Sequence, residues 1–351
     1  MGLQARMERS AVNHVAIDLG SLNSQICMRS AEGTILLEKK VKTEELPRLV
    51  TTWPPSRVVC ETSSEAFLIA DHAKAAGHQV RVVRSTLSKE LGVGDRGIKT
   101  DRRDARKLSE VSTRIDLPAV HVPSMRGRLW RSILRSRELL IETRTKAVSH
   151  VRGWLRTQLM KLRRGATETF PARVRELWTE DNPLPAHIAS VLIAIDTLNE
   201  QVSASMKQIR ELAKNDDVCL RLMTIPGVGP ISSMAFVAAI DDVTRFPNVH
   251  RVQSYLGLTP GEDSSSKRER RTGITKAGPS SVRRVLIQAA WVANRFRSND
   301  PMVKWATRIE ERRGKHIAVV ALARKISGVM FALWRDQTRY SPLEAAMTTR
   351  S

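Results

Sequence analysis

The stretch Lys99-Thr100-Asp101-Arg102-Arg103-Asp104-Ala105-Arg106 organises the interpretation of the whole chain. Thr100 is a good helix N-cap and the aspartates fall in the first turns, so the stretch predicts a helix start. Asp101 and Asp104 are three residues apart and therefore share one helix face. Two close carboxylates repel each other unless a cation such as Mg²⁺ lies between them. The alternative is an exposed helix start with Asp–Arg pairs.

Upstream of this stretch, two short apolar segments each end in an acid. Residues 14–18 end in Asp18 and residues 56–61 end in Glu61. Burying a carboxylate at the end of a strand is costly unless the carboxylate has a partner. Further strands are predicted over 24–28, 34–42 and 79–84, and helices over 44–51 and 65–76. The predicted order is therefore three hairpin strands followed by β-α-β-α.

The four carboxylates Asp18, Glu61, Asp101 and Asp104 occupy two neighbouring strand ends and one helix face. A ribonuclease H-like fold uses this arrangement to hold two metal ions about 4 Å apart for phosphoryl transfer. The sequence thus predicts a RuvC/ribonuclease H-like α/β catalytic domain over residues 11–115, with Mg²⁺ on these four acids. A structural ion pair would explain any one of them taken alone.

The composition indicates a polyanionic partner. The chain has 58 Lys and Arg against 36 Asp and Glu, a net charge of +22 and a pI of about 10.8. We find no signal-peptide core and no apolar run approaching ~18 residues, so we expect neither export nor a membrane span. Cys27, Cys60 and Cys219 fit no zinc spacing and are expected as buried thiols in a reducing compartment. We expect a cytoplasmic, nucleoid-associated protein.

Residues 120–215 form a predicted basic helical region. Between residues 126 and 164 there are twelve Lys and Arg and two Glu, and Arg131, Arg135 and Arg144 are candidate contacts to a nucleic-acid backbone. The following helix repeats apolar residues in heptads, with one row at 188, 195, 202 and 209 and another at 191, 198, 205 and 212. Such a repeat predicts a coiled-coil hairpin or dimer seam, and an ordinary packed core helix is the alternative.

A third, mostly helical region is predicted over residues 216–351. Ile225-Pro226-Gly227-Val228-Gly229 has the pattern of a helix-hairpin-helix turn, in which Gly227 and Gly229 allow backbone amides to approach a phosphate. A buried tight turn between core helices is the competing interpretation. Residues 232–240 predict an apolar helix after this turn.

A Ser/Arg-rich loop is predicted over residues 259–278. Three serines, at 264–266, precede a set of cations expected to contact phosphate: Lys267, Arg268, Arg270, Arg271, Lys276, Arg283 and Arg284. A serine hydroxyl attacks phosphorus only when it is deprotonated and the phosphate charge is neutralised, and guanidinium groups supply the second condition. Taken alone, such a Ser/Arg-rich loop is more often a flexible loop that contacts phosphate than the site of a nucleophile.

The motifs together resemble one family of insertion-sequence transposases. These proteins pair an Asp-Glu-Asp-Asp, RuvC-like domain with a serine-bearing transposase domain of the IS116/IS110/IS902 type, and Piv-type DNA invertases are related to them. The matching pieces, in the family's order, are Ile17-Asp18, Cys60-Glu61, residues 99–106, residues 225–229, Gly257-Leu258-Thr259-Pro260, Ser264-Ser265 and Gly273-Ile274-Thr275-Lys276-Ala277-Gly278.

The resemblance implies a recombinase that moves its own element, guided by a noncoding bridge RNA that pairs with donor and target DNA. It implies Asp18, Glu61, Asp101 and Asp104 as metal ligands. It also implies Ser265 as the nucleophile, by its distance from Pro260. The sequence departs from the family pattern at Ser64, at Leu19-Gly20, and at Ser266-Lys267, where glycines usually follow the serine pair. The last departure leaves Ser264, Ser265 and Ser266 as alternatives.

The reaction expected from these residues is strand exchange through a phosphoserine–DNA intermediate. Because the serine and the carboxylates fall in different regions, we expect a composite site, assembled between the subunits of a dimer or tetramer. Two other functions remain open. A metal-dependent nuclease of the junction-resolving kind needs the carboxylates but no covalent step, and a nucleic-acid scaffold needs neither.

Overall fold

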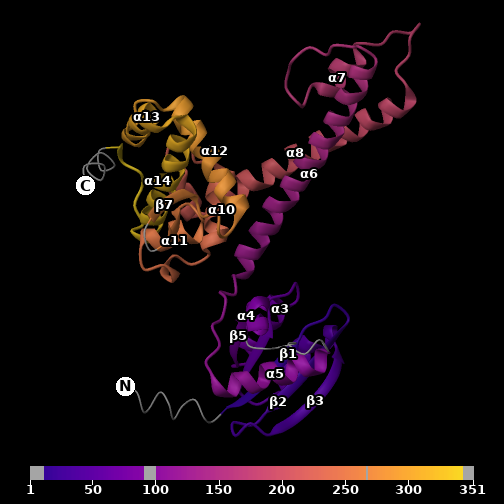
Figure 1. Cartoon of the computed structure of the whole chain (residues 1–351). Helices are drawn as coiled ribbons and strands as arrows, with labels where there is room; N and C mark the ends of the chain where they lie inside the picture. The colour runs from indigo at the N-terminus through magenta and orange to yellow at the C-terminus, as the bar shows by residue number, and fades with distance from the viewer. Residues whose placement is uncertain (1–11, 91–99, 266–267, 343–351) are drawn as a thin grey trace. The chain divides into compact units, whose positions relative to one another are not determined.

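The computed structural model describes residues 12–90, 100–265 and 268–342. Contacts between residues divide the chain into two compact units, Met1–Pro123 and Ser124–Ser351. The first unit is a mixed α/β domain and the second is mostly helical (Figure 1), as the sequence predicts. The basic helical region and the C-terminal region predicted from the sequence share the second unit.

A five-stranded sheet with the order β3-β2-β1-β4-β5 forms the centre of the first unit. The strands are β1 (Asn13–Asp18), β2 (Asn23–Arg29), β3 (Ile35–Lys42), β4 (Ser56–Glu61) and β5 (Gln79–Val83). β1 pairs antiparallel with β2, β2 pairs antiparallel with β3, and β4 and β5 run parallel to β1. This confirms the predicted order of three hairpin strands followed by β-α-β-α.

Helices cover both faces of this sheet. On one face, Ile69 of α3 (Ala66–Ala75) packs with Val15, Ile17 and Val58, together with α2 (Leu46–Leu49). On the other face, α5 (Asp101–Arg114) packs on β1, β2 and β4. The connections also contain the short helices η2 (Thr43–Glu45), η3 (Val50–Thr52) and α4 (Ser85–Glu90). β1, β2 and β4 are buried along most of their length because both faces of the sheet are covered there, whereas β3 is largely exposed.

Two long helices, α6 (Met125–Thr157) and α8 (Ala186–Lys214), pack side by side in the second unit (Figure 1). One predicted heptad row of α8 is buried, at positions 188, 195, 202 and 209, and the other row is half-buried. The short helix α7 (Phe170–Arg175) packs against the C-terminal end of α6 and the N-terminal end of α8. The heptads therefore mark the face that packs on α6; supercoiling of the pair stays a prediction.

The rest of the second unit is a helical bundle whose central helix is α14 (Lys315–Arg335). The other elements are α9 (Asp217–Leu222), α10 (Pro230–Ile240), η4 (Val243–Arg245), α11 (Val249–Tyr255), α12 (Ser280–Phe296) and α13 (Pro301–Arg313). By length and hydropathy, α14 alone among the described helices is long and apolar enough to cross a membrane. Most of its apolar side chains are buried, and the helix packs on α11, α12 and α13, as the core helix of a helical bundle does.

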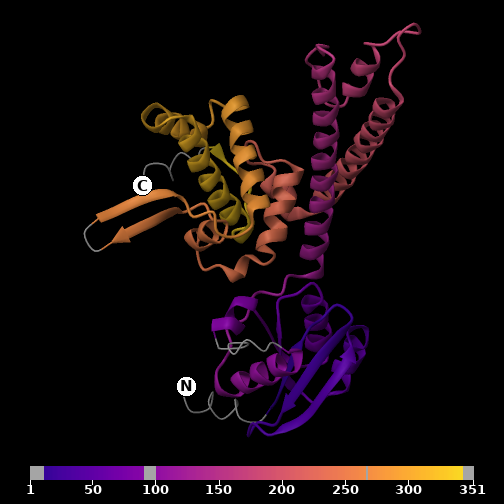
Figure 2. The same ribbon diagram turned by 45° about the vertical axis from the view of Figure 1, so that its right-hand side comes forward.

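The segment predicted as a Ser/Arg-rich loop is instead a β-hairpin. β6 (Pro260–Ser265) and β7 (Arg268–Ile274) pair antiparallel and extend from the bundle (Figure 2). The loop prediction was wrong because these strands lack the alternation of apolar and polar residues that identifies a half-buried strand. The prediction of three buried thiols is confirmed, since Cys27, Cys60 and Cys219 are all buried and free.

Candidate functional site

The carboxylates Asp18 and Glu61 end two adjacent parallel strands. The last paired residues of these strands are Ile17 and Cys60, so the two acids follow at the same edge of the sheet. Side chains alternate between the faces of a sheet. Asp18 therefore shares the face of Ala16, and Glu61 shares the face of Val59, which is the face that packs against Leu108 of α5. Both acids are half-buried.

Contacts between α5 and β1 bring Asp104 to the same edge. The His14 Nδ1 and Ser112 Oγ atoms lie 2.9 Å apart, and Ala16 packs with Leu108. Two strand residues span about 6.6 Å and four helix residues span about 6 Å. Every second residue of β1 therefore lies beside every fourth residue of α5. By this spacing, the next step along α5 places Asp104 toward the strand end that carries Asp18. The alternation of side chains along β1 and β4 and the helical spacing of α5 therefore place Asp18, Glu61 and Asp104 on the face of the sheet that α5 covers, at the edge where β1 and β4 end.

Asp104 is buried, with 7% of its surface exposed, whereas Asp101 is exposed at the helix start. Thr100 is the N-cap, as predicted, and its side chain accepts a hydrogen bond from the Arg103 amide. The Asp104 carboxylate has no hydrogen bond or ion pair with another described residue. Within the described ranges, no three acidic, histidine or cysteine side chains converge as a ready metal site.

The basic residues at the start of α5 pair with an acid that sequence reasoning did not select. Arg102 and Arg106 both form ion pairs with Glu38 of β3, and the Arg102 Nη2 to Glu38 Oε2 distance is 2.8 Å. The hydrogen bond from Arg106, together with Arg102, lowers the pKa of Glu38 to about 2. Among the described side chains, these arginines do not pair with Asp101 or Asp104, which removes the interpretation of the stretch as a set of Asp–Arg pairs. No sequence pattern connects Glu38 with residues more than sixty positions away.

In the second unit, the hairpin brings the serine segment opposite the cationic segment. In the ladder, Ser265 pairs with Arg268 and Ser264 with Glu269, while Arg270 and Arg271 pair with Asp263 and Glu262. Ser266 and Lys267, two of the predicted site residues, lie outside the described residues. Ser264 and Ser265 therefore stand at the end of β6 that is remote from the bundle.

The base of the hairpin is held by a clasp made of residues 256–259 and 275–278. The Thr275 amide donates to the Thr259 carbonyl at 2.9 Å, and the Lys276 amide donates to the Gly257 carbonyl at 3.2 Å. Gly257 has a φ of +67°, and a Cβ atom there would lie 2.0 Å from the Ala277 carbonyl oxygen. Glycine is needed at this position because the backbones of the two segments are in contact. The Gly-Leu-Thr-Pro and Gly-Ile-Thr-Lys-Ala-Gly motifs thus meet in space.

Arg283 completes the clasp. Its Nη1 atom donates to the carbonyl oxygens of Leu256 and Ala277, at 3.1 Å each, and its side chain is buried. Arg144 of α6 is likewise buried, and it donates to Glu168 and Asn199. Both arginines were predicted to contact nucleic acid, but the structure gives them intramolecular acceptors and a packing role.

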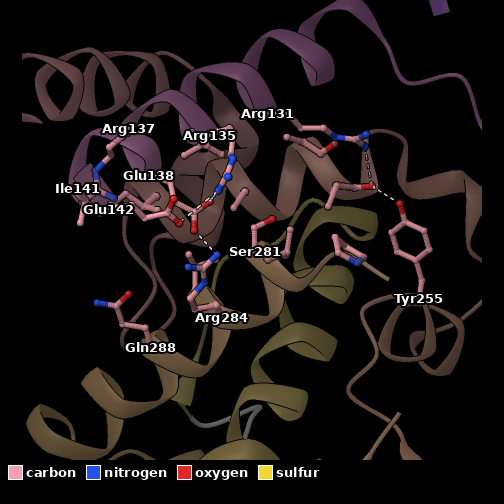
Figure 3. A pocket seen from close by; sticks show the side chains of 18 residues that line it. Arg131, Arg135, Arg137, Glu138, Ile141, Glu142, Tyr255, Ser281, Arg284 and Gln288 are labelled. Atoms are coloured by element: carbon pink, nitrogen blue, oxygen red, sulfur yellow. Dashed lines mark hydrogen bonds and ion pairs between the residues drawn. The ribbon is translucent and has the colours of Figure 1, made fainter. Parts of the chain in front are cut away.

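A groove of about 440 Å³ between α6, α10 and α12 is lined by three of the other candidate arginines, Arg131, Arg135 and Arg284 (Figure 3). Glu138 of α6 forms ion pairs with Arg135 and with Arg284 of α12. Arg131 donates to the carbonyls of Ala238 and Ala239 at the end of α10. The two acids of the basic helix, Glu138 and Glu142, both line this groove, and Glu142 also forms an ion pair with Arg135.

The glycine turn of residues 225–229 packs tightly on α12. Gly227 has a φ of +82°, and a Cβ atom there would lie 2.2 Å from the Ala289 carbonyl oxygen. The Gly229 amide lies at the start of α10. It donates a hydrogen bond to Ser232 Oγ at 2.9 Å within the same turn. The buried-turn interpretation therefore explains Gly227, and phosphate contact by either glycine stays a prediction.

Comparison with known proteins gives consistent matches to transposases along the chain. Residues 219–304 match the transposase IS116/IS110/IS902 family, and residues 15–159 match the IS110-type DEDD transposase domain. A putative transposase, y4qE, of Sinorhizobium fredii is 30% identical over 75% of this chain and 71% of its own length. A probable family 20 transposase of Pseudomonas aeruginosa is 28% identical over 94% and 99%. The transposase for insertion sequence element IS1111A of Coxiella burnetii is 25% identical over 95% and 93%.

Proposed function

Because the chain belongs to the IS116/IS110/IS902 family of insertion-sequence transposases, we propose that it exchanges DNA strands through a phosphoserine intermediate with Ser265 as nucleophile. The observation that carries the proposal is the hairpin. A clasp of glycine contacts and the buried Arg283 holds its base, and the serine stands at the far end of β6. A rigid base positions a nucleophile more accurately than an unpaired loop does.

The proposed chemistry is transesterification. The Ser265 hydroxyl loses its proton to a base, its oxygen bonds to phosphorus, and the bond from phosphorus to the leaving deoxyribose oxygen breaks as that oxygen takes up a proton. In the second half, a deoxyribose hydroxyl attacks the phosphoserine and releases the serine. The number of phosphoester bonds is unchanged, so no external energy source is required.

We propose that Asp18, Glu61, Asp101 and Asp104 hold a divalent cation, taken here as Mg²⁺. The donor set fits a hard cation, since all four are carboxylates, and Asp104 is buried with no partner among the described residues. When bound, such an ion would neutralise charge on phosphate oxygens and on the leaving oxygen. The residues themselves would orient the ion against the edge of the sheet where β1 and β4 end.

We further propose donor and target DNA as substrates, a noncoding guide RNA as partner, and a dimer or tetramer as the working assembly. The serine and the carboxylates belong to different units of the chain, which supports a composite site. The net charge of +22 suits the simultaneous binding of several nucleic-acid strands.

A covalent adduct tests the serine. Incubation of the protein with Mg²⁺, guide RNA and a nicked donor DNA should trap a protein–DNA adduct that survives denaturant and disappears on nuclease digestion. Ser265→Ala should lose the adduct and keep DNA binding, because one hydroxyl is removed. Ser264→Ala is the matched control and should retain the adduct. Peptide mapping to Ser264 or Ser266 would reassign the nucleophile, and strand cleavage without any adduct would favour the nuclease function.

A metal-dependent thermal shift tests the carboxylates separately. Asp104→Asn should hold or raise the melting temperature of the metal-free protein, because it removes a buried charge from a cluster of like charges. Mg²⁺ should then stabilise the unsubstituted protein more than the variant. Glu65→Gln, at the start of α3 on the opposite face of the sheet, is the control and should respond to Mg²⁺ as the unsubstituted protein does. Equal responses in all three proteins would refute the site.

A further inference from the structure

The solvent-facing side of α12 carries large apolar and aromatic side chains. The buried side of this helix consists of Val282, Arg283, Leu286, Ala289, Ala290 and Ala293. On the outward side, Phe296 is 65% exposed and Val292 is 42% exposed, and Trp291 is half-buried beside them. Val292 and Phe296 are four residues apart and share one helix face, and Trp291, next to Val292 in sequence, borders them to complete one stripe. A surface helix normally places polar residues there, so the stripe requires an explanation.

A hollow of about 600 Å³ lies along this stripe. Its lining residues are Gln288, Trp291, Val292, Asn294, Arg295, Phe296 and Lys315. The Lys315 Nζ atom lies 5.4 Å from the centroid of the Trp291 ring, and the Arg295 guanidinium lies 5.2 Å from the centroid of Phe296. Lys315 begins α14, which packs beside α12, so two helices supply the lining.

The chemistry of this lining fits a nucleotide. Aromatic rings stack on bases, side-chain amides of Asn and Gln hydrogen-bond to base edges, and Lys and Arg neutralise the adjoining phosphates. Among the described residues that line the hollow there is no carboxylate. The groove of Figure 3 differs in this respect, because Glu138 and Glu142 line it and form ion pairs with Arg135 and Arg284. The cations of the α12 hollow therefore have no acid lining the same space with which to pair.

We infer that this hollow binds an unpaired DNA strand by stacking a base against Phe296 and Trp291. A base is available for stacking only where the duplex is open, so the site selects single strands. DNA rather than RNA is the expected occupant because, on the proposed function, the strands that are opened and exchanged are DNA. Val292 and Phe296 also line a neighbouring hollow of about 820 Å³ that includes the turn of residues 225–229, which gives the strand room for more than one nucleotide.

The inference is independent of the serine and the carboxylates, so it can be tested with the intact chain in the absence of catalysis. The probe is a single-stranded oligodeoxynucleotide with one 2-aminopurine, whose fluorescence falls when it stacks on an aromatic ring. Binding should quench the probe. Phe296→Ala should abolish the quenching and weaken binding of the strand by about 5-fold to 150-fold, which is the range for loss of one stacked base. Phe296→Tyr should retain both effects.

Ile193→Ala is the matched control, because Ile193 is an apolar residue on α8 with 62% exposure. It should leave quenching and affinity unchanged. Absence of quenching with the unsubstituted protein, or equal loss in both alanine variants, would overturn the inference. Equal affinity for duplex DNA would also overturn it, and tighter binding of an RNA of the same sequence would overturn the choice of DNA. A change of oligomeric state in Phe296→Ala without loss of quenching would show that the stripe is a contact between copies of the chain.

Discussion

Replacement of Arg283 by methionine separates a packing role from a role in DNA contact. The adjacent residue Arg284 provides an internal comparison, because both were expected to contact phosphate. Arg283 is buried and donates to Leu256 and Ala277 across the clasp, whereas the Arg284 side chain is 58% exposed and pairs with Glu138. The two variants should therefore behave differently although the residues are neighbours in sequence.

The expected loss of folding stability in Arg283→Met follows from the two hydrogen bonds that the Arg283 side chain donates. A hydrogen bond from a charged donor contributes about 1.5–3 kcal/mol, and two carbonyl groups lose their donor in Arg283→Met. Methionine fills part of the volume, and removal of a buried charge offsets part of the loss, so we expect a net destabilisation of about 3 kcal/mol. For a unit of roughly 200 residues this corresponds to a fall in melting temperature of about 6–12 °C. Arg284→Met removes an exposed ion pair and should cost at most about 1 kcal/mol.

The assay combines thermal unfolding with the salt dependence of DNA binding. Arg283→Met should lower the melting temperature and leave the slope of log K against log salt unchanged, because its guanidinium neutralises no phosphate. Recombination should fall more than DNA binding, since the base of the serine hairpin is loosened. The reasoning is refuted if Arg283→Met melts like Arg284→Met, or if it flattens the salt slope by about 0.9 without a change in melting temperature.

Three further outcomes follow from the contacts described above. The folded-state pKa of Glu38 is about 2, below its ordinary value of 4.5, so its pairs with Arg102 and Arg106 stabilise the fold above about pH 4.5 and are lost as the pH falls toward 2. The difference in melting temperature between the unsubstituted protein and Glu38→Gln should therefore shrink over that range, and a constant difference would contradict the assignment. In urea unfolding, Gly257→Ala should destabilise the second unit by more than about 2 kcal/mol, because the residue has a positive φ and its new Cβ would meet Ala277. Gly153→Ala on α6, where a Cβ has open space, should instead stabilise the unit by about 0.5–1 kcal/mol. Joint replacement of the exposed residues Lys146 and Arg156 of α6 by Gln should reduce the salt slope of duplex binding by up to about 1.8, and Arg144→Gln should lower stability with no change in slope.

Local patterns in the sequence determined the strands of the first unit and the start of α5. The alternation and length of the apolar runs located all five strands of the sheet, and Thr100 located the start of α5 within one residue. These predictions hold because strand parity and helix capping depend on neighbouring residues only. The same parity places Asp18 and Glu61 on one face once their strands are known to be adjacent and parallel. The candidate carboxylates were therefore accessible from the sequence.

The partners of the charged side chains were decided only by the tertiary structure. Arg283 and Arg284 are adjacent and chemically identical, yet one closes the clasp and the other faces Glu138. Glu38 was overlooked because its partners, Arg102 and Arg106, lie on a helix far along the chain. The hairpin of β6 and β7 was missed for a related reason, since a polar strand is defined by the strand with which it pairs. A residue's type and spacing determine what it can bind, whereas long-range packing determines whether another part of the same chain has already bound it.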